Sequence, residues 1–338
     1  MPVPLEPPKW VKYRLSLNEN FFISRELLEG VIKRALESVD PRLYHDAYGE
    51  ELAESLAEFY RLDKREIVVG PGSDYLIELL ASYARGKCAA IIEPTFEEYE
   101  QSVKLFGGHI VKVLLERDFS LNPDKLRRAD AEILFIASPN NPTGNQFDEE
   151  VIEEVVSEFR GIVVVDEAYA EYARYSLIDK VGTYENLVVL RTFSKAWGLA
   201  GLRVGYAVSC SNLISELRKR MRPFATSSIS LKAAVIMLEY WDHVKRAIKA
   251  LIEVREWLRE EMTKLGVKPY PSDANFILAR FSLPVRIVAG KLLERGFSVK
   301  DVSHLPLCDN SLRITVPPRI IAVKLVNALK SILGEARC

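Results

Sequence analysis

The sequence has few of the residues that build disulfide frameworks or metal centres. Its four cysteines are far apart and form no C-x-x-C pair, lying at Cys88, Cys210, Cys308 and Cys338. We therefore expect reduced thiols in a cytoplasmic protein. The four histidines show no ligand spacing, which argues against a metal site. Apolar runs fall short of the roughly 18–20 residues that a membrane-spanning helix needs, so we expect no membrane insertion.

An excess of charge of either sign is also missing. Lys and Arg number 46, Asp and Glu number 47, and the formal net charge is −1. Such a chain has no field that would attract nucleic acid or an anionic membrane surface. Its 338 residues are too many for one small core. We expect two domains and a function that depends on localised binding sites.

Short apolar runs rich in β-branched residues alternate with amphipathic stretches through the first two thirds of the chain. This alternation predicts an α/β fold with a mostly parallel seven-stranded sheet covered by helices. The strands are expected at 67–69, 89–93, 110–114, 133–137, 162–165, 187–190 and 204–208. Helices are expected at 50–60, 74–83, 148–159 and 213–219. Ligand-binding residues in such a sheet belong in the loops at the carboxyl ends of the strands.

The pattern changes after residue 240. Residues 241–264 mix charged and apolar residues without Gly or Pro, which is typical of one long helix. Beyond it we expect strands at 274–280, 297–300 and 312–316, with helices at 285–295 and 320–332. The prediction is a large domain (36–240), then a connecting helix with a small α+β domain (241–338), against which an N-terminal segment (1–35) packs.

One segment places a lysine among hydroxyls, glycines and an arginine. It reads Thr192-Phe-Ser-Lys-Ala-Trp-Gly-Leu-Ala-Gly-Leu-Arg-Val-Gly-Tyr206. The amine of Lys195 can form a Schiff base with a carbonyl compound, and hydroxyls with the Arg203 guanidinium suit a phosphate. A carbonyl compound that carries its own phosphate suggests pyridoxal 5′-phosphate (PLP). Taken alone, the segment is better explained by a surface lysine near an unrelated, salt-bridging arginine.

Two further loops follow predicted strands and suit the same ligand. Gly72, Ser73 and Asp74 join a strand to a helix, so their backbone N–H groups could face an anion. Tyr75 stands where a dinucleotide-binding loop needs its third glycine, which makes nicotinamide binding the weaker alternative. The Asp74 side chain would repel a phosphate, so we assign it a backbone or capping role. Phe96 could stack on a flat ring, although a lone aromatic there is more often core.

Two more strand ends carry an amide and an acid. Asn141 lies in Ser138-Pro-Asn-Asn-Pro-Thr-Gly144 and could donate to a phenolate, although most such clusters are only turns. Asp166 ends a buried strand, where a carboxylate is costly unless it meets a cation such as a protonated pyridine. Its alternative role is a cap on the next turn. Tyr169 is three residues further on and could also reach the phenolate. Five such loops together favour a cofactor site.

In this order the motifs resemble those of the class I/II, fold-type I PLP-dependent aminotransferases, most closely the histidinol-phosphate aminotransferase branch. The resemblance covers nearly the whole chain. It includes Leu17-Asn-Glu-Asn20, Tyr44-His-Asp46, Gly72-Ser-Asp74, Pro94-Thr-Phe96, Asn140-Asn-Pro-Thr-Gly144, Asp166-Glu-Ala-Tyr169, Ser194-Lys-Ala-Trp-Gly-Leu-Ala-Gly-Leu-Arg203 and Leu312-Arg-Ile-Thr315. It implies the fold-type I architecture, with a large PLP-binding domain and a smaller one.

The resemblance also implies roles around the cofactor. Lys195 would form the Schiff base, and Asp166 would pair with the pyridine nitrogen and keep the ring an electron sink. Tyr169 and Asn141 would bond to the ring oxygen O3′. Phe96 would stack on the ring face. The cofactor phosphate would be held by Ser73, Thr192, Ser194 and Arg203, and Gly72 and Asp74 would also belong to the cofactor site.

On the substrate side the resemblance implies a shared site. Tyr44 would reach the phosphate from a partner subunit, so we expect a homodimer in which residues 1–35 also contact the partner. Arg313 would bind an anionic group of the substrate, helped by Lys300, Asn20 and Asn141. The implied reaction is ping-pong transamination, in which Lys195 moves a proton as general base and acid. Histidinol phosphate would be the amino donor and 2-oxoglutarate the acceptor, in histidine biosynthesis.

Departures from the branch fall on the substrate side. Pro8 stands where the branch has a tyrosine, and Lys300 stands where it has an arginine, which alone grips a phosphate bidentately. Residues 94–100 and 300–303 look like threonine-phosphate decarboxylase, a relative with the same cofactor. An aminotransferase for aromatic or other amino acids and this decarboxylase therefore stay open. A non-catalytic binding protein is disfavoured, because every catalytic position is filled.

Overall fold

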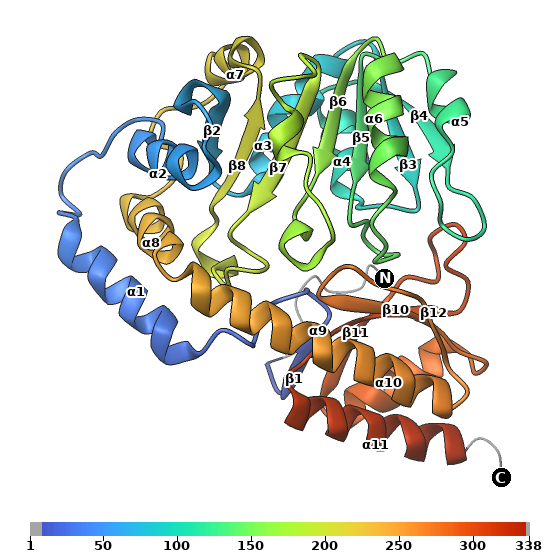
Figure 1. The fold of residues 1–338 in the computed structure, drawn as a ribbon. Helices are drawn as coiled ribbons and strands as arrows, with labels where there is room; N and C mark the ends of the chain where they lie inside the picture. Colours follow the sequence, from blue (N-terminus) through green and yellow to red (C-terminus); the bar gives the residue numbers. More distant parts are fainter. Residues whose placement is uncertain (1–8, 336–338) are drawn as a thin grey trace.

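The computed structural model describes residues 9–335, which form two β-sheets joined by one long helix (Figure 1). The first sheet has seven strands in the order β2-β8-β7-β6-β5-β3-β4. Their bounds are β2 (Ile67–Gly70), β3 (Cys88–Glu93), β4 (His109–Leu114), β5 (Ile133–Ala137), β6 (Ile162–Asp166), β7 (Leu187–Thr192) and β8 (Gly205–Ser209). Only β8 runs antiparallel to its neighbours. The predicted mostly parallel seven-stranded sheet is confirmed.

Helices cover both faces of this sheet, because its central strands are apolar on both sides. In β6, Val163 and Val165 face one hydrophobic cluster, whereas Val164 faces the other. Side chains alternate along a strand, so one run of valines supplies both faces. The flanking helices are α2 (Glu50–Tyr60), α3 (Ser73–Ala81), α4 (Glu98–Leu105), α5 (Pro123–Arg127), α6 (Glu149–Glu158), α7 (Ser211–Arg218) and α8 (Ser228–Leu238).

The second sheet has five strands in the order β1-β11-β12-β10-β9. They are β1 (Tyr13–Leu15), β9 (Lys268–Pro269), β10 (Phe276–Arg280), β11 (Phe297–Asp301) and β12 (Ser311–Thr315), with helices α10 (Val285–Glu294) and α11 (Arg319–Glu335). β1 pairs in parallel with β11, so the beginning of the described chain is an edge strand of the C-terminal sheet. This pairing brings residues 16–20 to the junction between the two sheets.

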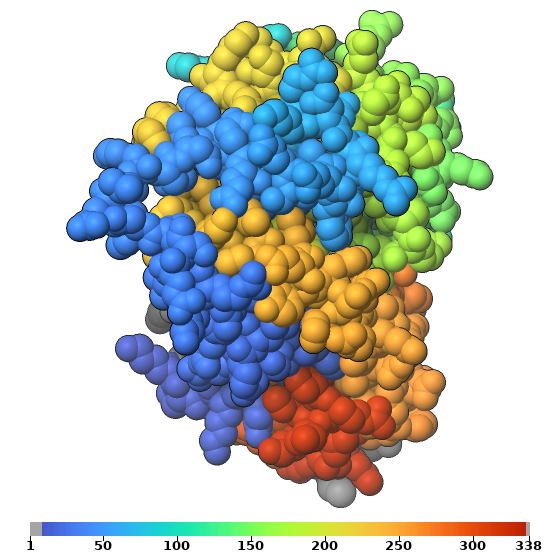
Figure 2. All heavy atoms as spheres, turned by 60° about the vertical axis from the view of Figure 1, so that its left-hand side comes forward, coloured from blue at the N-terminus to red at the C-terminus, as the bar shows by residue number. Residues whose placement is uncertain are grey.

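Two helices span the junction. α9 (Trp241–Lys264) runs from the first sheet to the second, as predicted, and α1 (Arg25–Ser38) packs against α8 (Figure 1). Figure 2 shows α1 and α2 in blue on the same face as α9 in orange and α11 in red. Among residues 9–335, none of the helices combines the length and apolar character needed to cross a bilayer.

Several elements escaped the sequence prediction for identifiable reasons. α8 is apolar around most of its circumference, so no amphipathic period marks it. α1 and β1 lie in the N-terminal segment, to which no elements were assigned, although Ser24 caps α1 by accepting from Leu27 N at 3.2 Å. The short elements α4, α5 and β9 were also not predicted, and the predicted bounds of the other elements differ from the structure by at most three residues.

A buried charge network lies at the carboxyl ends of β6 and β7. Arg191 is 5% exposed and lies 3.3 Å from a carboxylate oxygen of Glu167 and 3.2 Å from one of Glu171. Glu167 also accepts from Ser176 and Leu177, each at 2.6 Å. Burial raises the pKa of Glu167, and the Arg191 charge opposes that rise. The structure places Glu167 in the core, where it is 1% exposed.

Replacing Arg191 with Met should destabilise the fold, because Glu167 and Glu171 would stay buried without their cation. The expected loss is about 3–5 kcal/mol in the free energy of unfolding, measured by urea titration. Arg25→Met is the matched control, because its pair with Glu29 is solvent-exposed and should leave the urea midpoint nearly unchanged. Equal losses in the two variants would contradict a role for the buried network.

Candidate active site

A cavity of about 240 Å³ lies where the carboxyl ends of the first sheet's strands meet the N-terminal segment and β12. It collects most of the residues predicted for the cofactor, together with two predicted for the substrate, Arg313 and Asn141. These are Ser73, Asp74, Phe96, Asn141, Asp166, Tyr169, Thr192, Ser194, Lys195, Arg203 and Arg313. Loops separated by more than two hundred residues therefore enclose one space, as expected for a ligand site at the strand ends.

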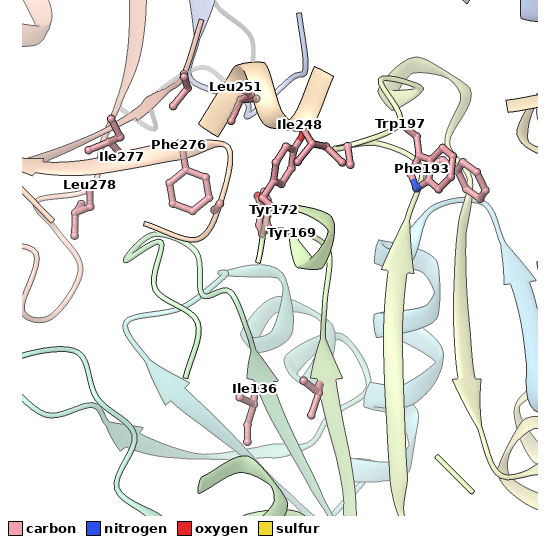
Figure 3. Close-up of a cluster of buried hydrophobic side chains, with 14 of the residues drawn as sticks. Ile136, Tyr169, Tyr172, Phe193, Trp197, Ile248, Leu251, Phe276, Ile277 and Leu278 are labelled. Carbon is pink, nitrogen blue, oxygen red and sulfur yellow. The ribbon is translucent and has the colours of Figure 1, made fainter. Parts of the chain in front are cut away.

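Lys195 lies in the loop between β7 and β8 and points its amine toward the N-terminal segment. Its Nζ donates to the carbonyl of Leu17 at 3.1 Å and lies 5.7 Å from the centre of the Tyr169 ring. The loop itself is rigid, because the fully buried Phe193 and Trp197 anchor it in the core (Figure 3). The lysine amine is thus carried by a loop whose neighbouring aromatic side chains are fully buried.

Asp166 is the buried carboxylate of the site, 5% exposed at the end of β6. Its Oδ2 accepts from the Tyr99 hydroxyl at 2.7 Å and its Oδ1 accepts from Ala168 N at 3.0 Å. Burial raises the pKa of Asp166 to about 6, although both hydrogen bonds favour the ionised form. Among residues 9–335 it forms no salt bridge. A buried carboxylate that lines a cavity and has no salt-bridge partner among the described residues fits a ligand with a protonated ring nitrogen.

The opposite end of the cavity fits a phosphate. α3 begins at Ser73, so its first N–H groups face the cavity, where an anion is favoured. Arg203 donates to Ser194 Oγ at 3.3 Å and to Asp74 Oδ2 at 2.5 Å. A side chain at Gly72 would collide with the guanidinium, since an added Cβ would lie 2.6 Å from Arg203 Nη2. Asp74, expected to act through its backbone or as a cap, instead holds the arginine.

Between these two ends lie the groups predicted for the ring and its oxygen. Phe96 packs edge-on against Tyr99, with ring centres 5.7 Å apart. The oxygen of Asn141 accepts from Arg313 Nη1 at 2.6 Å, which leaves the Asn141 amide N–H groups for a ligand. Tyr169 projects from the turn after β6, against Phe276 (Figure 3), with ring centres 5.2 Å apart. The structure therefore brings Phe96, Asn141 and Tyr169 to one cavity.

Arg313 lies deep in the wall formed by β12. Its guanidinium is buried, which lowers its pKa, while the charges of Tyr169 and Glu97 oppose that shift. Nη2 donates to the carbonyl of Ser16, and Nε has no hydrogen-bond partner among residues 9–335. A buried guanidinium with an unused donor suits an anionic ligand group.

Four predicted positions lie outside the cavity lining. Tyr44 lies between α1 and α2, 85% exposed, with its ring against Phe224. Lys300 stands opposite Arg313 in the β11–β12 ladder. Asn20 donates to Ala196 O at 2.8 Å and accepts from Phe22 N at 2.9 Å. Gly72 lies behind Arg203.

Pro8, which stands where the aminotransferase branch has a tyrosine, lies outside the described residues.

Two site residues had no place in the sequence prediction. The role of Tyr99 could not be predicted from spacing, because its partner Asp166 is 67 residues away. The available signal was that Tyr99, in the first turn of α4, follows Phe96 by three residues. Asn18 was part of a recognised motif without an assigned role, and the structure shows it donating to the Tyr169 hydroxyl at 2.9 Å. Both line the cavity.

Comparison with known proteins places this geometry in a family. The sequence profile described as "Aminotransferase class I and II" matches residues 11–332. A histidinol-phosphate aminotransferase from Pyrococcus furiosus is 37% identical over 331 residues, covering 96% of this chain and 94% of that protein. One from Thermoanaerobacter sp. is 38% identical over 332 residues, covering 95% and 93%.

Solved structures show the same fold. The histidinol-phosphate aminotransferase of Clostridium acetobutylicum superposes with a TM-score of 0.89 at 22% identity, covering 96% of this chain and 99% of that one. The enzyme from Sinorhizobium meliloti, in complex with pyridoxal 5′-phosphate, gives 0.88 at 24%, covering 96% and 92%. A threonine-phosphate decarboxylase from Porphyromonas gingivalis gives 0.84 at 22%, covering 95% and 99%. The profile match and the relatives show that the chain belongs to the class I and II aminotransferases.

Proposed function

We propose that this protein is a PLP-dependent aminotransferase that takes the amino group of histidinol phosphate and passes it to 2-oxoglutarate, in histidine biosynthesis. The observation that carries the proposal is that Asp166, buried and without a salt bridge among the described residues, lines the same cavity as Lys195. The likeness to histidinol-phosphate aminotransferases at 37% identity supports the choice of substrate.

Different residues of the cavity are assigned to different parts of the cofactor. We assign the phosphate to Ser73, at the start of α3, and to Thr192, Ser194 and Arg203, which lie at the end of β7 and in the loop after it. Gly72 and Asp74 shape that end of the cavity through their contacts with Arg203. Asp166 would pair with the ring nitrogen, Phe96 would cover a ring face, and Tyr169 and Asn141 would donate to O3′. When bound, PLP supplies an electron sink for charge that develops on the substrate's α-carbon.

Lys195 does the proton transfer in this proposal. Its amine is held by one neutral carbonyl, that of Leu17, so it can leave that contact at little electrostatic cost. As general base it removes the α-proton of the amino donor, and as general acid it returns a proton in the opposite half-reaction. Asp166 and Tyr169 keep fixed positions while the lysine moves.

The substrate's anionic group is assigned to Arg313 and Asn141, which are already hydrogen-bonded to each other. Lys300 stands beside Arg313 on the adjacent strand and adds positive charge at that wall. Asn20 contributes by holding the Ala196 carbonyl next to the lysine. A lysine attracts a phosphate without the bidentate geometry of an arginine, so phosphate recognition here rests on charge.

We further propose a cytoplasmic homodimer in which each subunit completes its partner's site. Leu43 and Tyr44 are 67% and 85% exposed, and nearby Phe224 is 42% exposed. Such exposed apolar side chains favour an interface. The proposed division of the chain is residues 1–35 for contact with the small domain and the partner, 36–240 for the large domain and 241–338 for the connecting helix and small domain.

Lys195→Ala should keep PLP without a covalent bond and lose turnover by roughly 10³-fold or more, because the general base is gone. Borohydride reduction followed by peptide mass spectrometry should find the adduct on Lys195 in the parent protein and no adduct in Lys195→Ala. Lys219→Ala, at an exposed lysine, is the control and should keep both adduct and turnover. Substantial transamination by Lys195→Ala would contradict the lysine's role.

Single half-reactions with purified, cofactor-loaded protein should identify the amino donor. Histidinol phosphate should convert the bound cofactor to its amine form, followed by its absorption spectrum. Phenylalanine, glutamate and threonine phosphate are run in parallel. Carbon dioxide release from threonine phosphate would replace the aminotransferase with the decarboxylase, and faster conversion by phenylalanine would make aromatic amino acids the donors.

Subunit complementation tests the shared site. Tyr44→Ala should weaken PLP binding by roughly tenfold or more, the loss of a hydrogen bond to a charged group. Mixing this variant with Lys195→Ala and exchanging subunits should restore up to about a quarter of the parent activity, because half the dimers then carry one intact site. If subunit exchange is verified and the mixture is no more active than the two variants measured separately and added, Tyr44 does not contribute to the partner's site.

A further inference from the structure

Residues 16–20 touch several of the groups assigned to catalysis. The carbonyl of Ser16 accepts from Arg313, and the carbonyl of Leu17 accepts from Lys195 at 3.1 Å. Asn18 donates to the Tyr169 hydroxyl at 2.9 Å. This segment follows β1, so the second sheet fixes its position. Of these contacts, the one between Asn18 and Tyr169 joins two side chains and determines the direction of a proton.

Asn18 is 1% exposed, and each of its polar groups has a partner. Its N–H donates to Thr315 Oγ1 at 3.0 Å, and its carbonyl accepts from Asn275 Nδ2 at 2.8 Å. Its side-chain oxygen accepts from the Thr315 hydroxyl at 3.1 Å. The backbone has φ 58°, a left-handed conformation that Asn adopts more readily than most residues.

These partners leave one orientation for the Asn18 amide. The Thr315 oxygen already accepts the Asn18 N–H, so its single proton is the one that reaches the Asn18 side-chain oxygen. The amide NH₂ therefore faces Tyr169 and can only donate to it. The hydrogen bonds of Thr315 thus determine which atom of the Asn18 amide, oxygen or nitrogen, faces Tyr169.

The orientation of Asn18 constrains the Tyr169 hydroxyl in turn. Because the phenolic oxygen accepts from Asn18, its own proton points elsewhere, and no acceptor among residues 9–335 takes it. Tyr169 lines the cavity and is held by the Phe276 ring. The free direction of its O–H bond is the cavity.

We propose that Asn18 is a positioning residue that fixes Tyr169 as a hydrogen-bond donor toward O3′ of the bound cofactor. The inference rests on the proposed cofactor site and concerns how its chemistry is adjusted. A donor at O3′ stabilises negative charge there, so the bound chromophore gives up its shared proton at lower pH. Thr315, on the strand that also carries Arg313, holds Asn18 in that orientation.

Asn18→Asp tests the proposal with a side chain of the same shape. A carboxylate cannot donate, so Tyr169 would turn its proton toward residue 18 and present a lone pair to O3′. The pH midpoint of the visible absorption change of the cofactor-loaded protein should rise by about one unit, roughly tenfold in the proton affinity. Glu19→Gln changes the charge of the same segment by one unit at a side chain that contacts Arg14 rather than Tyr169, and should shift the midpoint far less.

A double-mutant cycle with Tyr169→Phe separates positioning from structure. With no hydroxyl to turn, Asn18→Asp should shift the midpoint in that background only by the residual effect of its charge. Equal shifts in the two backgrounds would overturn the proposal. Asn18→Gly tolerates the left-handed backbone and adds no charge. It should give a smaller rise that vanishes with Tyr169→Phe, and it serves if Asn18→Asp fails to fold by thermal melting.

The proposed cofactor site and the positioning role fail in different ways. If the parent protein shows no visible band with PLP, the site assignment fails and the inference falls with it. If the band is present but the Asn18 variants shift it equally with and without the Tyr169 hydroxyl, the cofactor site stands and the positioning role alone is wrong.

Discussion

The arrangement of the site depends on one constraint: a carboxylate at the end of a buried parallel strand must be satisfied. Asp166 lies where β6 ends inside the molecule, out of contact with bulk water. Tyr99 from α4 and the N–H of Ala168 satisfy part of it, and the cavity takes the rest. Removing that carboxylate from water is unfavourable for the protein alone, and it becomes useful when a cationic ring nitrogen occupies the cavity. The site is therefore organised for a charged partner.

Glu167, the residue after Asp166, has its side chain on the opposite side of this strand end. Its side chain points away from the cavity and meets Arg191 and, through it, Glu171. Asp166 and Glu167 are neighbours in sequence, but alternation along the strand gives one a functional environment and the other a structural one. The network fixes the turn that carries Tyr169, while Trp197, which donates to Glu171 at 3.3 Å, ties the lysine loop to it.

The second sheet closes the site from the other side. Strand β1 sets the position of residues 16–20, which contact the substrate arginine, the lysine and the tyrosine in turn. β12 supplies both Arg313 and Thr315, so one strand holds the group assigned to the substrate and the group that orients Asn18. The arginine proposed to bind the substrate and the threonine that orients Asn18 are thus on the same short strand.

The sequence by itself determined the sheet, the strand-end loops and the residue types at Lys195, Asp166, Asn141 and Arg203. Those features follow from local patterns, since buried strands need apolar runs and ligand chemistry needs particular functional groups at their ends. Only the tertiary structure decided which groups meet. Tyr99 reaches Asp166, and Asn18 reaches Tyr169, across 67 and 151 residues. No period or spacing along the chain records such contacts, because they arise when separate elements pack together and share buried polar partners.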